Sequence, residues 1–164
     1  MLIINQLVGF GAGRSVVGYR YFRLTITRVN AGGEFVQAYN FRPLVGASVY
    51  PTDMTSNSAP SPLVASASSE VEAAYRAFDS NPSGTRWRAA VIADGSGYVG
   101  TESYVQIDLG AGNGILADAV LLDGTLAHYP KDFTVSGSND GSAWDVLLSV
   151  TGAVYTGAET FAFP

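Results

Sequence analysis

Short stretches in which apolar and polar residues alternate limit the possible fold more than any other feature of the chain. In residues 19–28, Phe22, Leu24 and Ile26 fall on one side of an extended backbone, and polar side chains fall on the other. Residues 104–110 repeat the pattern, with apolar residues at every second position. Since successive side chains of a β-strand point to opposite faces, both stretches are predicted to be strands with one buried face.

A turn signal near the C-terminus predicts a β-hairpin. Asp140 and Gly141 lie between the alternating runs at residues 133–136 and 144–148. The Asp-Gly pair favours the positive φ angles that a tight hairpin turn requires. These two runs are therefore expected to pair with each other.

The segment after the first predicted strand is expected to turn and become extended again. Residues 30–33 read Asn-Ala-Gly-Gly, a turn sequence, and an extended pattern resumes at residues 35–41. Pro43 has no backbone N–H and is predicted to block regular pairing beyond this point. A short apolar run at residues 117–122 predicts another strand.

Little of the sequence favours helix. Residues 51–69 are rich in Pro and Ser and are predicted to be loop, with Ser69 as a candidate N-cap for one short helical turn in residues 71–78. The 19 Gly and 7 Pro are scattered, which is typical of many tight turns. About seven or eight short strands in 164 residues predict one all-β domain, a β-sandwich or jelly roll.

The first eighteen residues are predicted to be an arm, with the folded domain over residues 19–164. Their Gly-rich end is too flexible for the interior of a regular element. They show neither the basic start of a secretory signal nor an apolar stretch of membrane-spanning length, so we expect assembly in the cytoplasm. The chain has no cysteine, which excludes disulfides, thiolate metal sites and a cysteine nucleophile.

An acidic charge balance disfavours nucleic acid as a partner. The net charge is −5 and the pI is about 4.6, so a phosphate backbone finds no general attraction. Residues 1–90 hold eight Arg and five acidic residues, whereas residues 91–164 hold one Lys and nine acidic residues. This asymmetry fits either a solvated surface or contact with a neighbouring copy.

Four short sequence blocks between residues 65 and 150 form one recognisable series. Residues 77–87 read AFDSNPSGTRW and residues 104–110 read YVQIDLG. Residues 129–135 read YPKDFTV and residues 138–144 read SNDGSAW. In this order they resemble the A-F-D-G-N-P-S-T-x-W loop, the W-I-Q-V-D-L-G strand and the P-K-D-F-T-V-x-x-S-x-D-G-x-x-W hairpin of discoidin domains, also called coagulation factor 5/8 type C domains. The resemblance implies a jelly-roll β-sandwich with ligand-binding loops at one end.

The family's closing strand has its counterpart near the start of this chain. Residues 20–26 read RYFRLTI, similar to the family's R-Y-V-R-L-x-I. The domain thus resembles a circularly permuted discoidin module, and residues 159–163 are expected to end beside the strand that begins at Tyr19. This arrangement is similar to modules of bacteriophage tail-fibre and baseplate proteins. It implies a virion component, expected to be a homo-oligomer whose N-terminal arm contacts other tail proteins.

The loop after Phe78 predicts either a calcium site or a hydrogen-bonded turn. Asp79, Asn81 and Thr85 supply side-chain oxygens within a short loop, and oxygen is the ligand that Ca²⁺ takes. In sugar-binding relatives of discoidin domains this loop often holds a structural Ca²⁺. The same side chains can instead bond to the loop backbone as an Asx turn, which needs no ion.

Candidate carbohydrate contacts are aromatic and polar residues in predicted loops. A tyrosine ring can stack on the flat face of a sugar, and Arg or His can donate to its hydroxyls. Four residues meet this description: Arg88, Tyr98, His128 and Tyr129. Other aromatic residues match family positions that fill the sandwich interior, namely Trp87, Phe133 and Trp144.

Binding is expected rather than catalysis. The chain has one His, no Cys, and neither a G-x-S-x-G nor an H-E-x-x-H motif, and its scarcity of basic residues argues against anionic membranes. We expect a non-enzymatic virion module that binds host cell-surface carbohydrate, with weak single sites multiplied by many copies. The alternative is a purely structural adaptor or decoration subunit with no glycan ligand.

Overall fold

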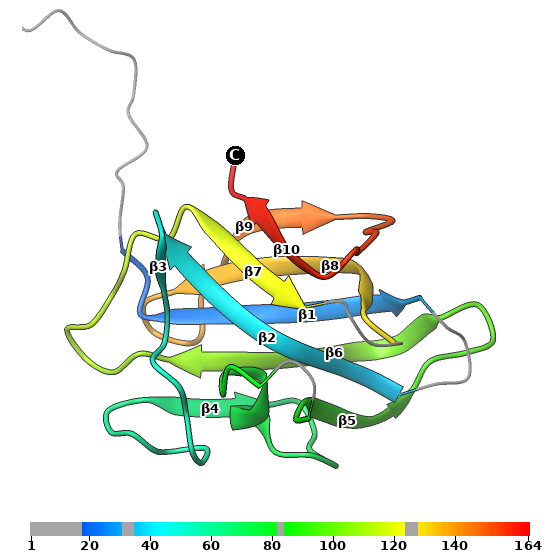
Figure 1. The fold of residues 1–164 in the computed structure, drawn as a ribbon, viewed down its shortest axis with the longest axis horizontal. Coiled ribbons are helices and arrows are strands. Elements are labelled where there is room, and N and C mark those ends of the chain that lie inside the picture. Colours follow the sequence, from blue (N-terminus) through cyan, green and yellow to red (C-terminus); the bar gives the residue numbers. More distant parts are fainter. Residues whose placement is uncertain (1–17, 31–34, 82–83, 124–127) are drawn as a thin grey trace, which may run out of the picture.

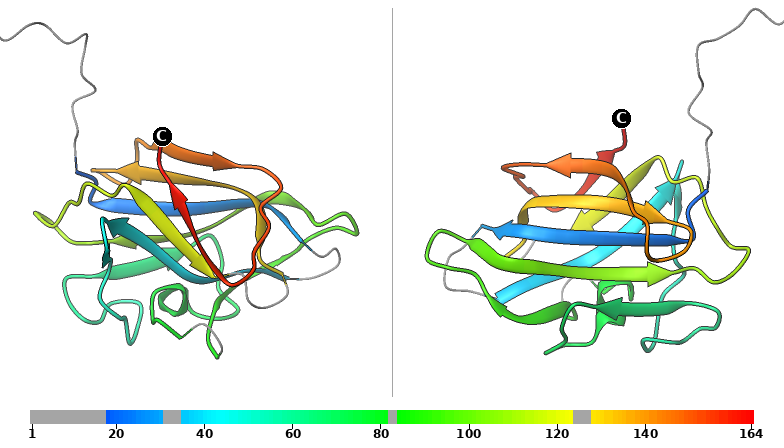
Figure 2. Two further views of the ribbon diagram at one scale, coloured as in Figure 1. Left: turned by 45° about the horizontal axis from the view of Figure 1, so that its top comes forward. Right: turned by 180° about the vertical axis from the view of Figure 1, so that it is seen from behind.

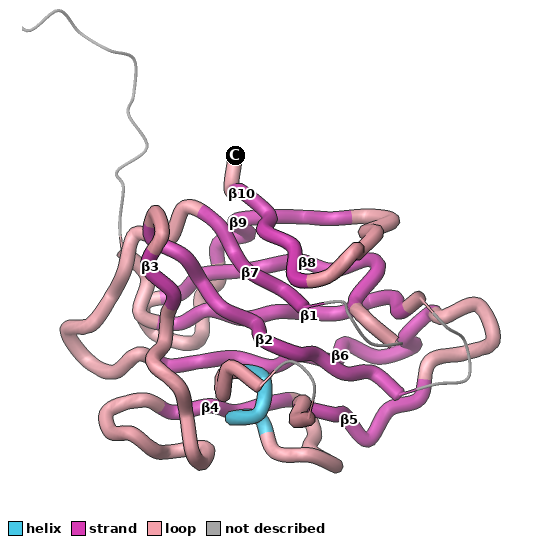
Figure 3. The backbone as a smooth tube through the Cα atoms, viewed as in Figure 1, coloured by secondary structure: helices cyan, strands magenta, loops and turns pink. Residues whose placement is uncertain are grey.

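The computed structural model describes residues 18–30, 35–81, 84–123 and 128–164, which contain ten strands and one 3₁₀ turn (Figure 1). The strands are β1 (Tyr21–Val29), β2 (Phe35–Val45), β3 (Ser48–Val49), β4 (Val64–Ala67), β5 (Trp87–Ile92), β6 (Tyr98–Asp108), β7 (Ala119–Asp123), β8 (Pro130–Ser138), β9 (Asp145–Val150) and β10 (Ala158–Ala162). The 3₁₀ turn, η1, spans Ala74–Ala77 and is the cyan segment of Figure 3. The predicted all-β fold is confirmed, with more strands than the seven or eight expected.

The strands form two antiparallel sheets that pack face to face as a β-sandwich (Figures 1 and 2). The first sheet has the order β4-β6-β1-β8-β9; the second has the order β10-β7-β2-β3, and β5 also pairs with β2. β1 is central in the first sheet, between β6 and β8. The fold therefore depends on pairing between segments that are far apart in the sequence.

The core lies between the sheets and follows the alternation in the sequence. Phe22, Leu24 and Ile26 on β1 are fully buried, as are Val105 and Ile107 on β6. Burying a side chain of this size contributes roughly 1.5–3 kcal/mol. The prediction of one buried face for each strand is confirmed.

Two of the three aromatic residues assigned to the interior are buried, and one is not. Trp87 and Phe133 are buried in the core, and Trp87 Nε1 donates a 2.9 Å hydrogen bond to the Ser69 carbonyl. The prediction for Trp144 is wrong. Its ring is partly exposed and lies 3.9 Å from the guanidinium carbon of Arg23, on the polar face of β1, with the ring of Tyr21 edge-on beside it.

The predicted hairpin is confirmed between β8 and β9. Asp140 Oδ1 accepts hydrogen bonds from the backbone N–H groups of Ser142 and Ala143, at 2.8 and 2.9 Å. Gly141 has a φ of +74°, which a residue with a Cβ adopts at a cost.

Pro43 does not block pairing. β2 continues to Val45, and Pro43 lies opposite Val120 of β7. A register shift between Tyr39 and Arg42 precedes the proline, and such an irregularity is where a sheet tolerates a residue without an N–H. β1 and β2 lie in different sheets, and most of the predicted turn between them falls outside the described residues.

Ser69 does not cap the short helical turn. Its Oγ accepts from the N–H of Ala90, and it lies too early in the chain to reach η1, whose first residue is Ala74. The N–H of Ala74 is bonded by Glu70 Oε2, and that of Tyr75 by Asn57 Oδ1. A carboxylate and a distant carboxamide thus take the place of the predicted hydroxyl cap.

The chain does not end beside the strand that Tyr19 begins. β10 pairs with β7 in the second sheet, whereas Tyr19 forms a bridge with Ile115 and leads into the first sheet. Of the predicted arm, residues 1–17 lie outside the described part of the chain. In the described part, no helix has the length and apolar character needed to cross a membrane.

Candidate functional site

A buried arginine connects the middle of β2 to two loops. Arg42 is 4% exposed, and its Nη1 donates to the Phe78 carbonyl at 3.0 Å and to Ser80 Oγ at 2.8 Å. Its Nη2 donates to the Pro51 carbonyl at 2.7 Å and to Asp53 Oδ1 at 2.9 Å. Hydrogen bonds from Ser80 and from Arg42 hold the pKa of Asp53 below its ordinary value. Both loops are thereby fixed to the sandwich.

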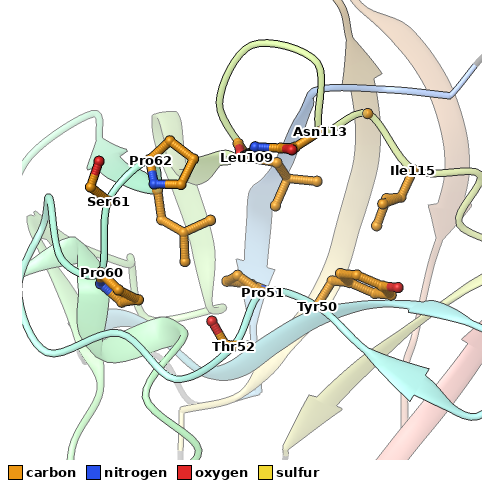
Figure 4. Close-up of a pocket in the computed structure, with 11 residues that line it drawn as sticks. Tyr50, Pro51, Thr52, Pro60, Ser61, Pro62, Leu109, Asn113 and Ile115 are labelled. Carbon is orange, nitrogen blue, oxygen red and sulfur yellow. Dashed lines mark hydrogen bonds between the residues drawn. The ribbon is translucent and has the colours of Figure 1, made fainter.

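The loop that contains Pro51 forms one wall of an open cleft of about 390 Å³ (Figure 4). The opposite wall is the loop between β6 and β7. Figure 4 shows Tyr50 and Ile115 at one end of the cleft, Pro60 and Ser61 at the other, and Pro51 between them. The lining residues are Tyr50, Pro51, Thr52, Pro60, Ser61, Pro62, Leu63, Leu109, Asn113, Gly114 and Ile115.

Close contact between the two loops fixes the width of the cleft. Gly110 has a φ of +88°, and a Cβ built there would lie 2.6 Å from Pro62 Cβ, so only glycine fits. Asn113 Nδ2 donates to the Leu109 carbonyl at 2.9 Å, which closes the turn that follows β6. Asn113 is exposed and lines the cleft, and its side-chain oxygen is a hydrogen-bond acceptor.

The lining has the chemistry of a binding site for an uncharged molecule. It consists of apolar side chains with one aromatic ring, plus the hydroxyls of Thr52 and Ser61 and the carboxamide of Asn113. No Asp, Glu, His, Lys or Arg is among the lining residues. The cleft can contact an apolar face and bond to a few hydroxyls, and Tyr50 adds a phenolic hydroxyl to the uncharged polar groups of its lining.

Three of the four predicted contact residues lie near the other end of the sandwich. Tyr98 begins β6 and Leu109 follows the end of that strand, which places them roughly 35 Å apart at the usual rise per residue. Tyr98 is 54% exposed and lies opposite Arg28 of β1. The Tyr129 carbonyl accepts from Asn30 N at 3.3 Å, so His128 and Tyr129 adjoin the same end of β1.

The ring of Tyr129 packs against another aromatic side chain of the sandwich. Its centroid lies 4.5 Å from that of Tyr155, which in turn packs edge-on against Phe161 of β10. Burial raises the pKa of the Tyr155 hydroxyl well above its ordinary value. One face of the Tyr129 ring is therefore occupied, whereas Tyr98 remains open to solvent.

Arg88 belongs to a different group of side chains. It lies on β5, where its guanidinium carbon is 4.3 Å from the centre of the Phe35 ring and its Nε is 3.5 Å from Glu72 Oε1. Glu72 also pairs with Arg76 and Arg86, each at 3.1 Å. Arg88 thus contacts Phe35 and Glu72, whereas Tyr98 and Tyr129 lie beside Arg28 and Asn30 at the end of β1.

The predicted calcium loop has the geometry of a hydrogen-bonded turn. Asp79 Oδ1 accepts from the N–H of Asn81 at 3.1 Å, and its Oδ2 accepts a short hydrogen bond from the hydroxyl of Thr85. Both carboxylate oxygens thus have donors from the chain itself, whereas Ca²⁺ takes six to eight oxygens. The described residues contain no group of three or more His, Cys, Asp or Glu side chains placed to hold a metal. The described geometry fits the Asx turn, and calcium stays a prediction.

Comparison with known protein families, with curated proteins and with solved structures found no match to this chain. The discoidin resemblance therefore rests on the sequence motifs alone. Sequence reasoning missed the cleft, because its two walls read as ordinary Pro-rich and Gly-rich loops. The sequence feature that could have indicated the cleft was Tyr50, an aromatic residue beside a proline at the start of a long loop.

Proposed function

We propose that this chain is a non-enzymatic carbohydrate-binding module of a bacteriophage virion, part of a tail fibre or baseplate. The observation that carries the proposal is the cleft between residues 50–63 and 109–115, an open site on a rigid all-β scaffold. Its mixture of one aromatic ring, apolar walls and uncharged polar groups suits a sugar, which has both apolar ring faces and hydroxyls. The virion assignment comes from the motif resemblance.

A single shallow cleft predicts weak binding. Few polar groups line it, and an open site leaves much of a bound sugar in water. Copies displayed together raise the apparent affinity by effective concentration, without any new contact. The module is therefore expected to work as a homo-oligomer or in many copies on one particle.

The experiment presents the purified protein on beads, to restore multivalency, to a panel of bacterial surface polysaccharides. Tyr50→Ala removes the aromatic ring from the cleft, and Val154→Ala, at a residue 76% exposed and outside the lining, is the control. Competable binding that Tyr50→Ala loses and Val154→Ala keeps supports the proposal. Absence of binding across the panel contradicts it and favours the structural adaptor or decoration subunit.

A further inference from the structure

Three of the six arginines in the ion pairs of the described residues have a carboxylate of their own. Three such one-to-one pairs connect different parts of the sandwich: Arg20–Asp108, Arg28–Asp132 and Arg42–Asp53. In each pair one positive charge faces one negative charge.

The other three arginines share one carboxylate, that of Glu72. Three guanidinium groups share its carboxylate: Arg76 Nη1 lies 3.1 Å from Oε2, Arg86 Nη2 lies 3.1 Å from Oε1, and Arg88 Nε lies 3.5 Å from Oε1. We call these four residues the Glu72 cluster. Because arginine stays protonated in proteins, the four residues of the cluster together carry two more positive charges than negative ones, on a chain with a net charge of −5.

Regular backbone structure positions the Glu72 cluster. Glu72 and Arg88 form a β-bridge, with hydrogen bonds of 3.2 and 3.3 Å between their backbone groups. Arg76 follows Glu72 by four residues through η1, which brings it to the same side. Arg86 directly precedes β5 and Arg88 is its second residue, and both reach the same carboxylate oxygen of Glu72. The guanidinium groups are thus held together before any ligand arrives.

The cluster remains accessible at its outer ends. The side chains of Arg76, Arg86 and Arg88 are 36%, 29% and 23% exposed, whereas that of Glu72 is 17% exposed. Each Nε is covered by protein and makes no hydrogen bond among the described residues, although that of Arg88 lies 3.5 Å from Glu72 Oε1. A polar ligand therefore reaches these arginines through their terminal Nη groups. These groups form a plane that matches a carboxylate with two parallel hydrogen bonds.

An apolar surface adjoins the charges. The Phe35 ring lies under the guanidinium of Arg88 and is itself 36% exposed. A ligand with a carboxylate on a ring that has an apolar face can contact both features at once. Nucleic acid needs an extended basic surface, which an acidic chain with one compact cluster does not provide.

We propose that the Glu72 cluster binds the carboxylate of an acidic sugar, so that the glycan of this module is a carboxylated polysaccharide. This inference rests on the proposed function, since it names the class of glycan. It adds a second contact region, apart from the cleft. Outer Nη groups of Arg86 and Arg88 donate to the sugar carboxylate, while Glu72 keeps the arginines in place.

The test measures binding to oligogalacturonate and to the same oligosaccharide after chemical reduction of its carboxyl groups. The buffer holds no divalent cations, because carboxylated sugars bind these themselves. Arg88→Gln and Arg86→Gln each remove one charge from the cluster, and Arg28→Gln removes one charge elsewhere on the surface. Arg28 is a matched control, since it also pairs with one carboxylate and is 40% exposed.

We expect the acidic oligosaccharide to bind more tightly than its reduced form, with an affinity that falls as salt rises. Loss of a charge-assisted hydrogen bond predicts at least about tenfold weaker binding for Arg88→Gln and Arg86→Gln, and no comparable loss for Arg28→Gln. Equal affinity for both forms, or equal loss in Arg28→Gln, overturns the inference. If neutral glycans bind the cleft without an acidic preference, the proposed function survives and the inference fails. If neither neutral nor acidic glycans bind, both fail.

Discussion

Arg42 Nη2 donates a 2.7 Å hydrogen bond to the carbonyl of Pro51, from the sandwich interior to the wall of the cleft. The same guanidinium bonds to the Phe78 carbonyl, at the start of the Asp79 loop. One buried side chain on β2 therefore sets the position of two surface loops. Arg42 does not line the cleft, so we regard it as a positioning residue.

Replacing Arg42 with methionine is expected to destabilise the fold and weaken glycan binding. Methionine fills much of the space but leaves the Pro51 and Phe78 carbonyls without their donors, which predicts a loss of roughly 3 kcal/mol in the free energy of unfolding. Chemical denaturation measures this loss. A variant as stable as the wild type would show that the two loops hold their positions without Arg42.

Substitution of Gly110 by alanine is expected to push the two walls of the cleft apart. The new Cβ meets Pro62 and the positive φ is strained, which together predict a loss of about 2–3 kcal/mol in stability. Gly112→Ala is the matched control, because Gly112 has a φ of +80° with nothing within 4 Å of its built Cβ. It is expected to lose about 1 kcal/mol and to keep the cleft. Equal losses in the two variants would show that the contact with Pro62 is unimportant.

The pair formed by Arg20 and Asp108 predicts a pH dependence of stability. Partial burial raises the pKa of Asp108, but the two 2.6 Å hydrogen bonds from Arg20 and the bond from the Gly110 N–H lower it further, so the net shift is downward. A lowered pKa in the folded state stabilises the fold at neutral pH. This stabilisation is lost as the pH falls below the ordinary Asp range near 4 and through the lowered pKa.

The free energy of unfolding, measured from pH 7 to pH 3, is expected to fall more steeply in the wild type than in Asp108→Asn. The variant lacks the titrating carboxylate, so the difference between the two proteins should shrink in acid. Parallel curves would mean that Asp108 titrates alike in the folded and unfolded chains.

The Asp79 loop is expected to behave as a hydrogen-bonded turn. Asp79→Ala removes the acceptors used by the Asn81 N–H and the Thr85 hydroxyl, which predicts a loss of roughly 1–2 kcal/mol whether or not calcium is present. Thermal melting with calcium and with a chelator measures both proteins. A melting temperature that calcium raises in the wild type, but not in the variant, would instead establish the calcium site.

The sequence predicted those parts of the fold that depend on local patterns. Alternation identified the buried faces of β1 and β6, and Asp140-Gly141 identified the hairpin, because both signals are complete within a few residues. Trp144 was assigned to the core because it matches a position of the discoidin motif that fills the sandwich interior. Its true position depends on Arg23, which β1 brings beside it from more than a hundred residues away.

The candidate site could not be read from the sequence for the same reason. The cleft forms only where the loop containing Tyr50 meets the loop containing Asn113, and nothing local shows that Gly110 touches Pro62. The sequence also contained no indication that the arginines around Glu72 lie close together. Only Arg88 was singled out, and its ion-pair partner Glu72 was not.

The most direct test compares Tyr50→Ala with Tyr98→Ala for binding to a glycan that the wild-type protein recognises on beads. Both variants remove one tyrosine ring, but from opposite ends of the sandwich. We predict that Tyr50→Ala loses most of the binding and that Tyr98→Ala keeps it. Retained binding in Tyr50→Ala, with loss in Tyr98→Ala, would contradict the cleft as the carbohydrate site and place that site at the end formed by Tyr98, His128 and Tyr129.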